Sequence, residues 1–353
     1  MIINKDILCY IFTWLKPAEL AIAKCVCKQW SKIIPKQKLF INMFTKRIQL
    51  AEWALSTGYK GRGLCTASAS NGDLNTLKWA REAGHPFGMN TARKATQGGY
   101  LDILKWLKEN GCLFDEKLME YAVNDLNVMK WLHDEGFIFS ENLFQKAAVA
   151  GNIDILNWLW EEKCPFNSVI ASSNAANANN LHVLKWMNEK NIQLSSFTCH
   201  YAAGNGNLEM LKWAIEENLP LDELVCSAAA KFGKLDVLKW LRKHDCPWNK
   251  DTCNDAAHQG HLEILKWAHE QGCPWDSDVC AIAAENGHLH VLKWARAEGC
   301  PWDSRVRSYS WDNDHHDILK WARSEGCPGN PKHFESMTNW LDLSKCMRDV
   351  LKI

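Results

Sequence analysis

The chain has 353 residues, 41 basic and 41 acidic side chains, and a formal charge of zero. Its length allows two or more domains, whereas the balanced charge argues against an acidic tail and against a general nucleic-acid binder, which usually carries a basic excess. We find no secretory signal and no uninterrupted apolar run of about 18 residues. The fifteen cysteines therefore favour a reducing compartment, cytoplasm or nucleus, and no membrane span is expected.

Residues 1–44 have the pattern of a small module of three short helices. Lys16-Pro17 ends the first apolar stretch, and Pro17 can occupy the first turn of the next helix. The apolar residues along these helices are Ile7, Leu8, Ile11, Phe12, Leu15, Leu20, Val26 and Trp30. So small a core is hard to stabilise alone, and we expect the module to need a partner.

This stretch resembles an F-box, whose members read L-P-x-E-I-L-x-x-I-F-x-x-L, then a proline-containing turn, then V-C-x-x-W. The matching residues, in order and spacing, are Asp6-Ile7-Leu8, Ile11-Phe12, Leu15, Pro17, Leu20, Val26-Cys27 and Trp30, while Ile3-Asn4 replaces the opening Leu-Pro. The resemblance implies docking on the Skp-family adaptor of a cullin-type ubiquitin ligase. The implied contact residues are Ile7, Leu8, Ile11, Phe12, Leu15, Pro17, Leu20, Val26 and Trp30, some of which must also hold the module together. An ordinary three-helix capping bundle is the alternative.

A degenerate repeat unit, "AEWALSTG" around Trp53, occupies residues 45–63 and is expected to cap the regular repeats. Variants of Leu-Lys-Trp then recur, and seven of the nine intervals between them are 27 residues. The repeated residues are Trp79, Trp106, Trp131, Trp158, Trp186, Trp213, Trp240, Trp267, Trp294 and Trp321. A fixed period of this length indicates a solenoid, propeller or array, so residues 64–329 are predicted to hold about ten stacked units.

Each unit has the pattern of two short helices. In the unit from Thr252, "TCNDAAHQ" predicts a first helix that ends at Gly260, and "HLEILKWAHEQ" predicts a second. Gly272 then stands where a helix C-terminus favours a left-handed residue. Cys273-Pro274 prevents continuation, and Asp276 or Ser277 can cap the next first helix.

The recurring tryptophan is interpreted as packing between units, because one helix pair cannot bury its own apolar face and stacked pairs can. Trp267 lies three residues after Ile264, on the same side of its helix. A second aromatic is expected to seal the turn after the second helix; these residues are Trp248, Trp275, Trp302, Phe87, Phe114, Phe139 and Phe166. An aromatic cage for a ligand is the alternative interpretation of the same residues.

The unit resembles the ankyrin repeat, T-P-L-H-x-A-A-x-x-G-H, because Ala256-Ala257, Gly260-His261, Leu262 and Gly272 fall in register. The period is 27 and not 33, and Cys253 replaces the ankyrin proline. The resemblance implies an all-α solenoid of about ten ankyrin-like helix pairs that lack β-turn fingers. Short units of this kind also resemble those of F-box and ankyrin-repeat proteins of large DNA viruses, which would place the protein in a host cell.

A varied surface on the first helices is the candidate site for a client protein. Counted from each repeat tryptophan, positions −11 and −10 are mostly alanine, whereas positions −12, −9 and −8 change from unit to unit on one helix face. The client-binding candidates are Tyr201, Lys231, Phe232, Asp255, His258, Gln259, Glu285 and Tyr309. Drift on a solvated surface is the alternative.

Three other features are interpreted as structural. Lysine precedes the tryptophan in nine of ten units, but neighbours such as Glu263 and Glu270 around Lys266 neutralise this row. The cysteines recur without metal-ligand spacing, and His261 and His288 are expected to hydrogen-bond to backbone and not to bind zinc. We expect no metal and no cofactor.

Departures from the repeat predict bends or caps. The unit around Trp131 is two residues short, Asn179-Asn180 replace the Gly-His turn, and Ser310-Trp311 replace the alanine pair of the last unit. Residues 330–353 are expected to close the stack with a final helix.

No phosphate-binding loop, nucleophile motif or isolated pair of carboxylates stands out, and "GYKGRG" at residues 58–63 lacks the required spacing. We therefore expect no enzyme. The residues predict a substrate-recruiting ligase adaptor with an unidentified client, or a scaffold or decoy that holds a host protein without ubiquitin transfer. Neither a nucleic acid nor a membrane is expected as partner.

Overall fold

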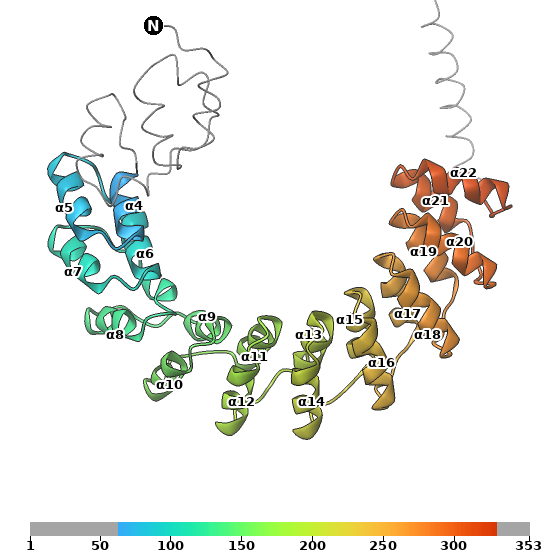
Figure 1. The fold of residues 1–353 in the computed structure, drawn as a ribbon, viewed down its shortest axis with the longest axis horizontal. Coiled ribbons are helices and arrows are strands. Elements are labelled where there is room, and N and C mark those ends of the chain that lie inside the picture. Colours follow the sequence, from blue (N-terminus) through green and yellow to red (C-terminus); the bar gives the residue numbers. More distant parts are fainter. Residues whose placement is uncertain (1–62, 330–353) are drawn as a thin grey trace, which may run out of the picture. The chain divides into compact units, whose positions relative to one another are not determined.

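The structure is a computed structural model that describes residues 63–329 (Figure 1). Within this range the chain forms nineteen α-helices and one 3₁₀-helix, and it contains no β-strand. The prediction of an all-α repeat body without β-turn fingers is confirmed for these residues. The predicted module at 1–44, the unit around Trp53 and the predicted cap at 330–353 lie outside the described residues.

Ten helix pairs succeed one another, each pair ending in a helix that carries the repeat tryptophan. The first elements of the pairs are α4 (Leu64–Ser70), α6 (Met89–Gln97), η3 (Leu118–Tyr121), α9 (Leu143–Ala150), α11 (Ser168–Asn177), α13 (Thr198–Asn205), α15 (Glu223–Lys231), α17 (Lys250–His258), α19 (Ser277–Glu285) and α21 (Arg305–Asp312). The second helices are α5 (Leu74–Glu82), α7 (Leu101–Glu109), α8 (Leu126–Asp134), α10 (Ile153–Glu161), α12 (Leu181–Glu189), α14 (Leu208–Glu216), α16 (Leu235–Lys243), α18 (Leu262–Glu270), α20 (Leu289–Ala297) and α22 (His316–Ser324). Every second helix starts five residues before its tryptophan.

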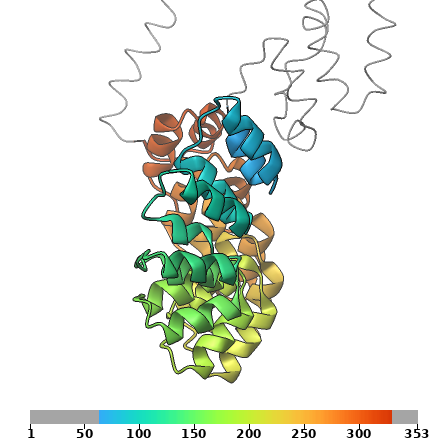
Figure 2. The same ribbon diagram turned by 90° about the vertical axis from the view of Figure 1, so that its left-hand side faces the viewer.

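The chain divides into two compact units, Met1–Asn167 and Ser168–Ile353. In the second unit the first helices α11 to α21 pack side by side, each against the next, and each also packs on its own second helix (Figures 1 and 2). The first unit has the same plan with α4 to α10. None of the helices in residues 63–329 is long and apolar enough to cross a membrane.

The helix boundaries coincide with the turn residues. Gly260 between α17 and α18 has φ +74° and Gly272 after α18 has φ +78°, left-handed values that glycine adopts without a Cβ penalty. The side chain of Asp276 accepts a hydrogen bond from the amide of Asp278 and caps α19. Where glycine is absent the left-handed residue is Asn, Asp or Lys, as at Asn179 (φ 61°) and Asp314 (φ 59°).

The core lies between the two helix layers. In the second helices, positions −3, −2 and +1 from the tryptophan are buried, as in Ile264, Leu265 and Ala268. The alanine pairs of the first helices are buried as predicted, and their small size lets neighbouring first helices approach closely. Fully buried leucine, valine and alanine thus fill the centre of each layer.

The tryptophans themselves lie at the edge of this core, which corrects the prediction in part. Trp158, Trp186 and Trp213 are buried at 9%, 6% and 6% exposure. The other repeat tryptophans are half-buried; they are Trp79, Trp106, Trp131, Trp240, Trp267, Trp294 and Trp321. Since none of these ten tryptophans is fully exposed, they contribute apolar contacts, but they do so beside the aliphatic core and not at its centre.

The short unit around Trp131 also departs from the simple pattern. Its first element is the four-residue 3₁₀-helix η3 and not an α-helix. The segment between Phe114 and α8 is two residues shorter than its counterparts, and the tighter 3₁₀ geometry suits such short pieces. Met119 still fills the core position and is 1% exposed.

Candidate interaction surfaces of the repeat body

The turn histidines join each repeat to the preceding one. Nε2 of His261, His288 and His315 donates a hydrogen bond to the backbone carbonyl of Lys231, His258 and Glu285, at 3.2, 3.0 and 3.0 Å. Each acceptor lies at the C-terminal end of the preceding first helix, where carbonyl groups lack helical partners. The prediction that His261 and His288 bind backbone is confirmed.

The turn cysteines have a similar structural role. The thiols of Cys246, Cys273, Cys300 and Cys327 each donate to the carbonyl of the residue 24 positions earlier, at 3.5, 3.4, 3.3 and 3.4 Å. The eleven cysteines of the described range are free and buried. Burial raises the pKa of the Cys327 thiol to about 11, so this thiol stays protonated and unreactive at neutral pH.

In six units the second aromatic packs across the repeat boundary, against the tryptophan of the next unit. Trp275 lies against Trp294 of the next repeat with ring centroids 5.7 Å apart, and it also stacks on His269 at 4.0 Å. In other repeats a phenylalanine takes the same place, as in Phe87 against Trp106 at 6.0 Å. We call this arrangement the aromatic clasp. These contacts agree with the predicted seal of the turn after the second helix.

The predicted client-binding residues lie on the first helices of the second unit or, for Phe232 and Gln259, directly after them. Lys231, Phe232, His258, Gln259 and Glu285 are exposed, while Tyr201, Asp255 and Tyr309 are half-buried. Their order places them along neighbouring helices α13 to α21.

Some of these residues also serve the contact between repeats. The Phe232 ring covers Gly204 of the preceding helix, where an added Cβ would lie 2.9 Å from Cδ2. The carbonyls of Lys231, His258 and Glu285 accept the histidine hydrogen bonds described above. The choice of residue at these positions is therefore partly constrained by the packing between neighbouring repeats.

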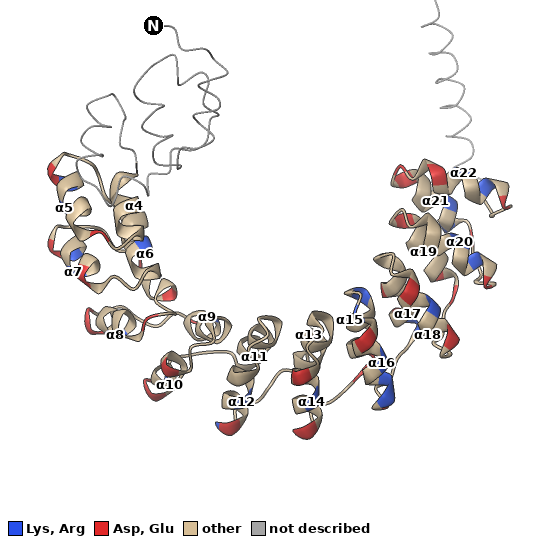
Figure 3. Ribbon diagram, in the orientation of Figure 1, with Lys and Arg blue, Asp and Glu red and all other residues tan. Residues whose placement is uncertain are grey.

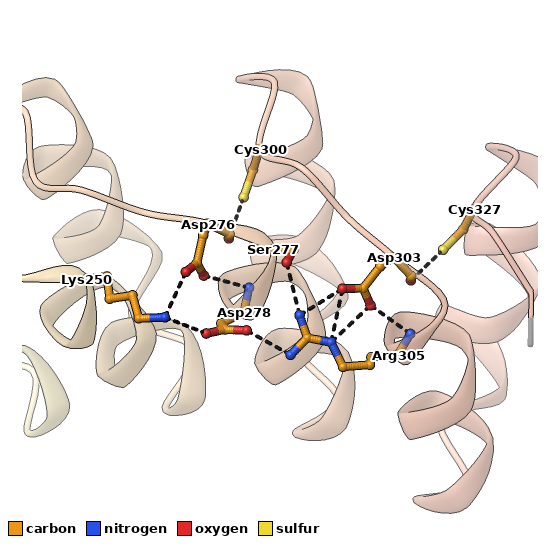
Figure 4. Close-up of polar contacts among 8 residues, drawn as sticks. All are labelled: Lys250, Asp276, Ser277, Asp278, Cys300, Asp303, Arg305 and Cys327. Carbon is orange, nitrogen blue, oxygen red and sulfur yellow. Dashed lines mark hydrogen bonds and ion pairs between the residues drawn. The ribbon is translucent and has the colours of Figure 1, made fainter.

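A charged network connects the N-terminal ends of α17, α19 and α21 (Figure 4). Nζ of Lys250 contacts Asp276 and Asp278 at 2.8 and 3.0 Å, and Arg305 contacts Asp278 and Asp303 at 2.7 and 2.8 Å. The Arg305 guanidinium, and then Lys250, hold the pKa of the Asp278 carboxyl below its usual range. Because these groups are partly solvated, each pair stabilises the fold little, but together the pairs neutralise the charges of this network.

The equivalent ends of α11, α13 and α15 carry apolar side chains instead. At position −16 from the tryptophan these are Ile170, Phe197 and Leu224, exposed at 46%, 46% and 45%. Neither α11 nor α13 contains a lysine, arginine, aspartate or glutamate, whereas α15 and α17 contain both signs of charge (Figure 3). The sequence-based selection of positions −12, −9 and −8 missed this column. The sequence does contain a signal for this column: an apolar residue recurs at position −16 in three successive units, whereas later units place Asp251, Asp278 and Arg305 there.

The residues predicted to bind the Skp-family adaptor lie outside the described residues, and the structure places none of them. They are Ile7, Leu8, Ile11, Phe12, Leu15, Pro17, Leu20, Val26 and Trp30.

Comparison with known families identifies this segment. The F-box-like family model matches residues 5–46, a range that includes all nine predicted contact residues. No curated protein matches the chain. The chain thus carries an F-box-like domain at its N-terminus, succeeded by a body of helical repeats.

Proposed function

We propose that the chain is a substrate-recruiting adaptor of a cullin-type ubiquitin ligase. The observation that carries this proposal is the family match at residues 5–46, in front of a body made of stacked helix pairs. The F-box-like domain docks on a Skp-family adaptor, and the repeats hold a client protein. Transfer of ubiquitin belongs to the assembled ligase, while this chain supplies proximity and the choice of client.

Several finer assignments belong to the same proposal. The repeats are shortened ankyrin units, which is supported by the left-handed glycine of most turns and by the turn histidines His261, His288 and His315. The protein acts in the cytoplasm or nucleus, of a host cell if the chain is viral. It has no catalytic site, and its partners are the adaptor and a client, not nucleic acid or membrane.

Co-purification with a Skp-family adaptor and its cullin tests the proposal. The full chain should retain both proteins, and the double change Leu8→Asp with Ile11→Asp should abolish retention because it places two charges on the apolar docking face. Phe232→Ser, on the repeats, is the matched control and should leave retention unchanged. Circular dichroism of each variant verifies that the repeat helices remain folded. Absence of adaptor binding by the unchanged chain would overturn the proposal.

A scaffold or decoy that holds a host protein is the second candidate. It is favoured by one observation, the replacement of the family's opening Leu-Pro by Ile3-Asn4. Addition of ubiquitin-activating and conjugating enzymes to the purified complex separates the two functions. Ubiquitin on the bound client supports the ligase adaptor, and stable client binding without ubiquitin transfer supports the decoy.

A further inference from the structure

The N-terminal ends of three neighbouring first helices form an exposed apolar row. It consists of Ile170 on α11, Phe197 at the start of α13 and Leu224 on α15, each nearly half exposed. The row ends at α17, where Asp251 takes the same position. Large apolar side chains that gather on neighbouring elements, next to charged ones, are typical of a surface that binds a partner.

Hydrogen-bond acceptors without partners accompany this row. Ser227 lies one turn after Leu224 and is 3% exposed, yet its hydroxyl oxygen has no hydrogen-bond partner among the described residues. Oδ1 of Asn254, on α17, is also buried and unpartnered within this range. Buried polar atoms of this kind are costly unless another molecule completes their hydrogen bonds.

Asp255, beside Asn254, adds a carboxylate that forms no salt bridge within the described residues. It is half-buried, and none of the described residues forms an ion pair or a hydrogen bond with its side chain. Burial raises the pKa of the Asp255 carboxyl above its usual value, an effect that Lys231 partly offsets. We call Ser227, Asn254 and Asp255 the acceptor group.

The row and the acceptor group belong to one surface. Nδ1 of His200 on α13 donates to the carbonyl of Leu224 on α15 at 3.1 Å, and the His200 ring lies 6.1 Å from that of Phe197. His200 and Lys231 also interact electrostatically with Asp255. Helices α13, α15 and α17 therefore bring both features together.

The charges near this surface favour a cation. The acidic residues at the start of α15 and on α17 are Asp222, Glu223, Asp251 and Asp255, against Lys231 alone, because Lys250 is engaged with Asp276 and Asp278. The Asp255 carboxylate can accept the hydrogen bonds of an ammonium or guanidinium, and the buried oxygens of Ser227 and Asn254 lie on the same helices.

We infer that this surface binds an extended client segment. The segment carries two apolar side chains and one basic side chain, each three residues from the next. Neighbouring helices stack about 8–10 Å apart, and an extended polyproline-type segment advances about 9 Å in three residues. Its apolar side chains pack on Phe197 and Leu224, and its lysine or arginine pairs with the half-buried carboxylate of Asp255. The inference rests on the proposed function only in taking the occupant to be the client.

Binding of labelled peptides to the full chain, measured by fluorescence anisotropy, tests this inference. One peptide carries leucine, leucine and arginine in this order, each three residues from the next, in a Pro/Ser background. A second peptide carries the same three residues in the opposite order. Two matched peptides carry glutamate in place of the arginine. At least one of the two arginine peptides should bind roughly tenfold more tightly than its matched glutamate peptide. An effect of this size is typical of the loss of one residue that anchors an interface. Equal binding of both charges, or of neither, overturns the inference.

Two variants and a control locate the site. Leu224→Ser should weaken the arginine peptide roughly tenfold, and Asp255→Asn should remove the preference for arginine over glutamate. Leu113→Ser changes an apolar residue that is 75% exposed in the first unit and should have no effect. If both site variants bind the peptides like the unchanged chain, this surface is not the binding site. Adaptor co-purification is measured on the same variants and should be unchanged, so a failure of adaptor binding is distinguished from a failure of this inference.

Discussion

At the scale of single residues, the turn glycine and the turn histidine act as a pair that spans two repeats. Gly260 has φ +74°, and an added Cβ would lie 2.8 Å from Nδ1 of His288 in the next repeat. The glycine is therefore required twice, for its left-handed backbone and for the space that the imidazole occupies. Gly272 has φ +78° but no atom within 4 Å of an added Cβ, so only the first requirement applies there.

This contrast predicts different costs for the same substitution. Gly272→Ala should lower the free energy of unfolding by about 1–2 kcal/mol, the cost of a left-handed alanine. Gly260→Ala should cost about 1 kcal/mol more, because His288 must move and its hydrogen bond to His258 is lost. Urea unfolding monitored by circular dichroism measures both values, and equal losses would show that the imidazole does not constrain the glycine.

His288 also makes stability depend on pH. Desolvation lowers the pKa of His288 below its ordinary value of 6.5, so the unfolded chain binds this proton more readily than the folded chain. The stabilisation is complete above the unfolded-state pKa and decreases as the pH falls through the lowered value. His288→Gln should make the free energy of unfolding depend less on pH between about pH 7.5 and 5.5. His316→Gln, a change at an exposed residue, serves as control, and identical pH profiles for all three proteins would contradict the prediction.

At the scale of elements, the aromatic clasp joins the end of one helix pair to the second helix of the next. The residue two positions after the repeat tryptophan also covers the ring of the turn aromatic, as Arg242 does 4.3 Å above Trp248 and Arg296 does 4.3 Å above Trp302. Cation–π and edge-to-face contacts each add stability beyond the area buried. The clasp therefore couples neighbouring pairs at their outer edge, away from the aliphatic centre.

Removal of one clasp should destabilise the protein measurably. Trp275→Ala is expected to cost about 2–3 kcal/mol, less than the loss of a fully buried aromatic because the ring is half-buried. Trp275→Phe should restore most of this loss, since Phe87 makes the same contact with Trp106. Chemical unfolding of the three proteins measures the difference. A phenylalanine variant as unstable as the alanine variant would mean that the indole itself is required.

At the scale of the whole molecule, packing is local. Among the described residues, the helices with extensive contacts are partners of one pair or first elements of adjacent pairs. Stability in such an array is close to a sum of repeat and nearest-neighbour terms. A change in one repeat should therefore weaken its neighbours and leave distant repeats unaffected.

Hydrogen exchange can detect this locality. In the Gly260→Ala variant, amides of α17 to α20 should exchange faster than in the unchanged chain, because the altered turn contacts the next repeat. Amides of α4 to α7 should exchange at the same rate in both proteins. Uniform acceleration throughout the chain would indicate a single cooperative transition and would contradict the local picture.

The sequence by itself determined the number of helix pairs, their approximate boundaries and the F-box-like domain. Its 27-residue period repeats the same turn glycines and apolar spacing, and these local signals need no tertiary information. The aliphatic pattern around Trp267 also indicated which helix face is buried. It could not distinguish a tryptophan in the centre of the core from one at its edge, since both share one helix face.

Only the tertiary structure decided how repeats meet. The contact of His288 with Gly260 and the clasp of Trp275 with Trp294 join residues 28 and 19 positions apart, on surfaces that face each other only after stacking. The apolar row of Ile170, Phe197 and Leu224 emerged for the same reason. Exposure of these side chains depends on what the neighbouring helices cover.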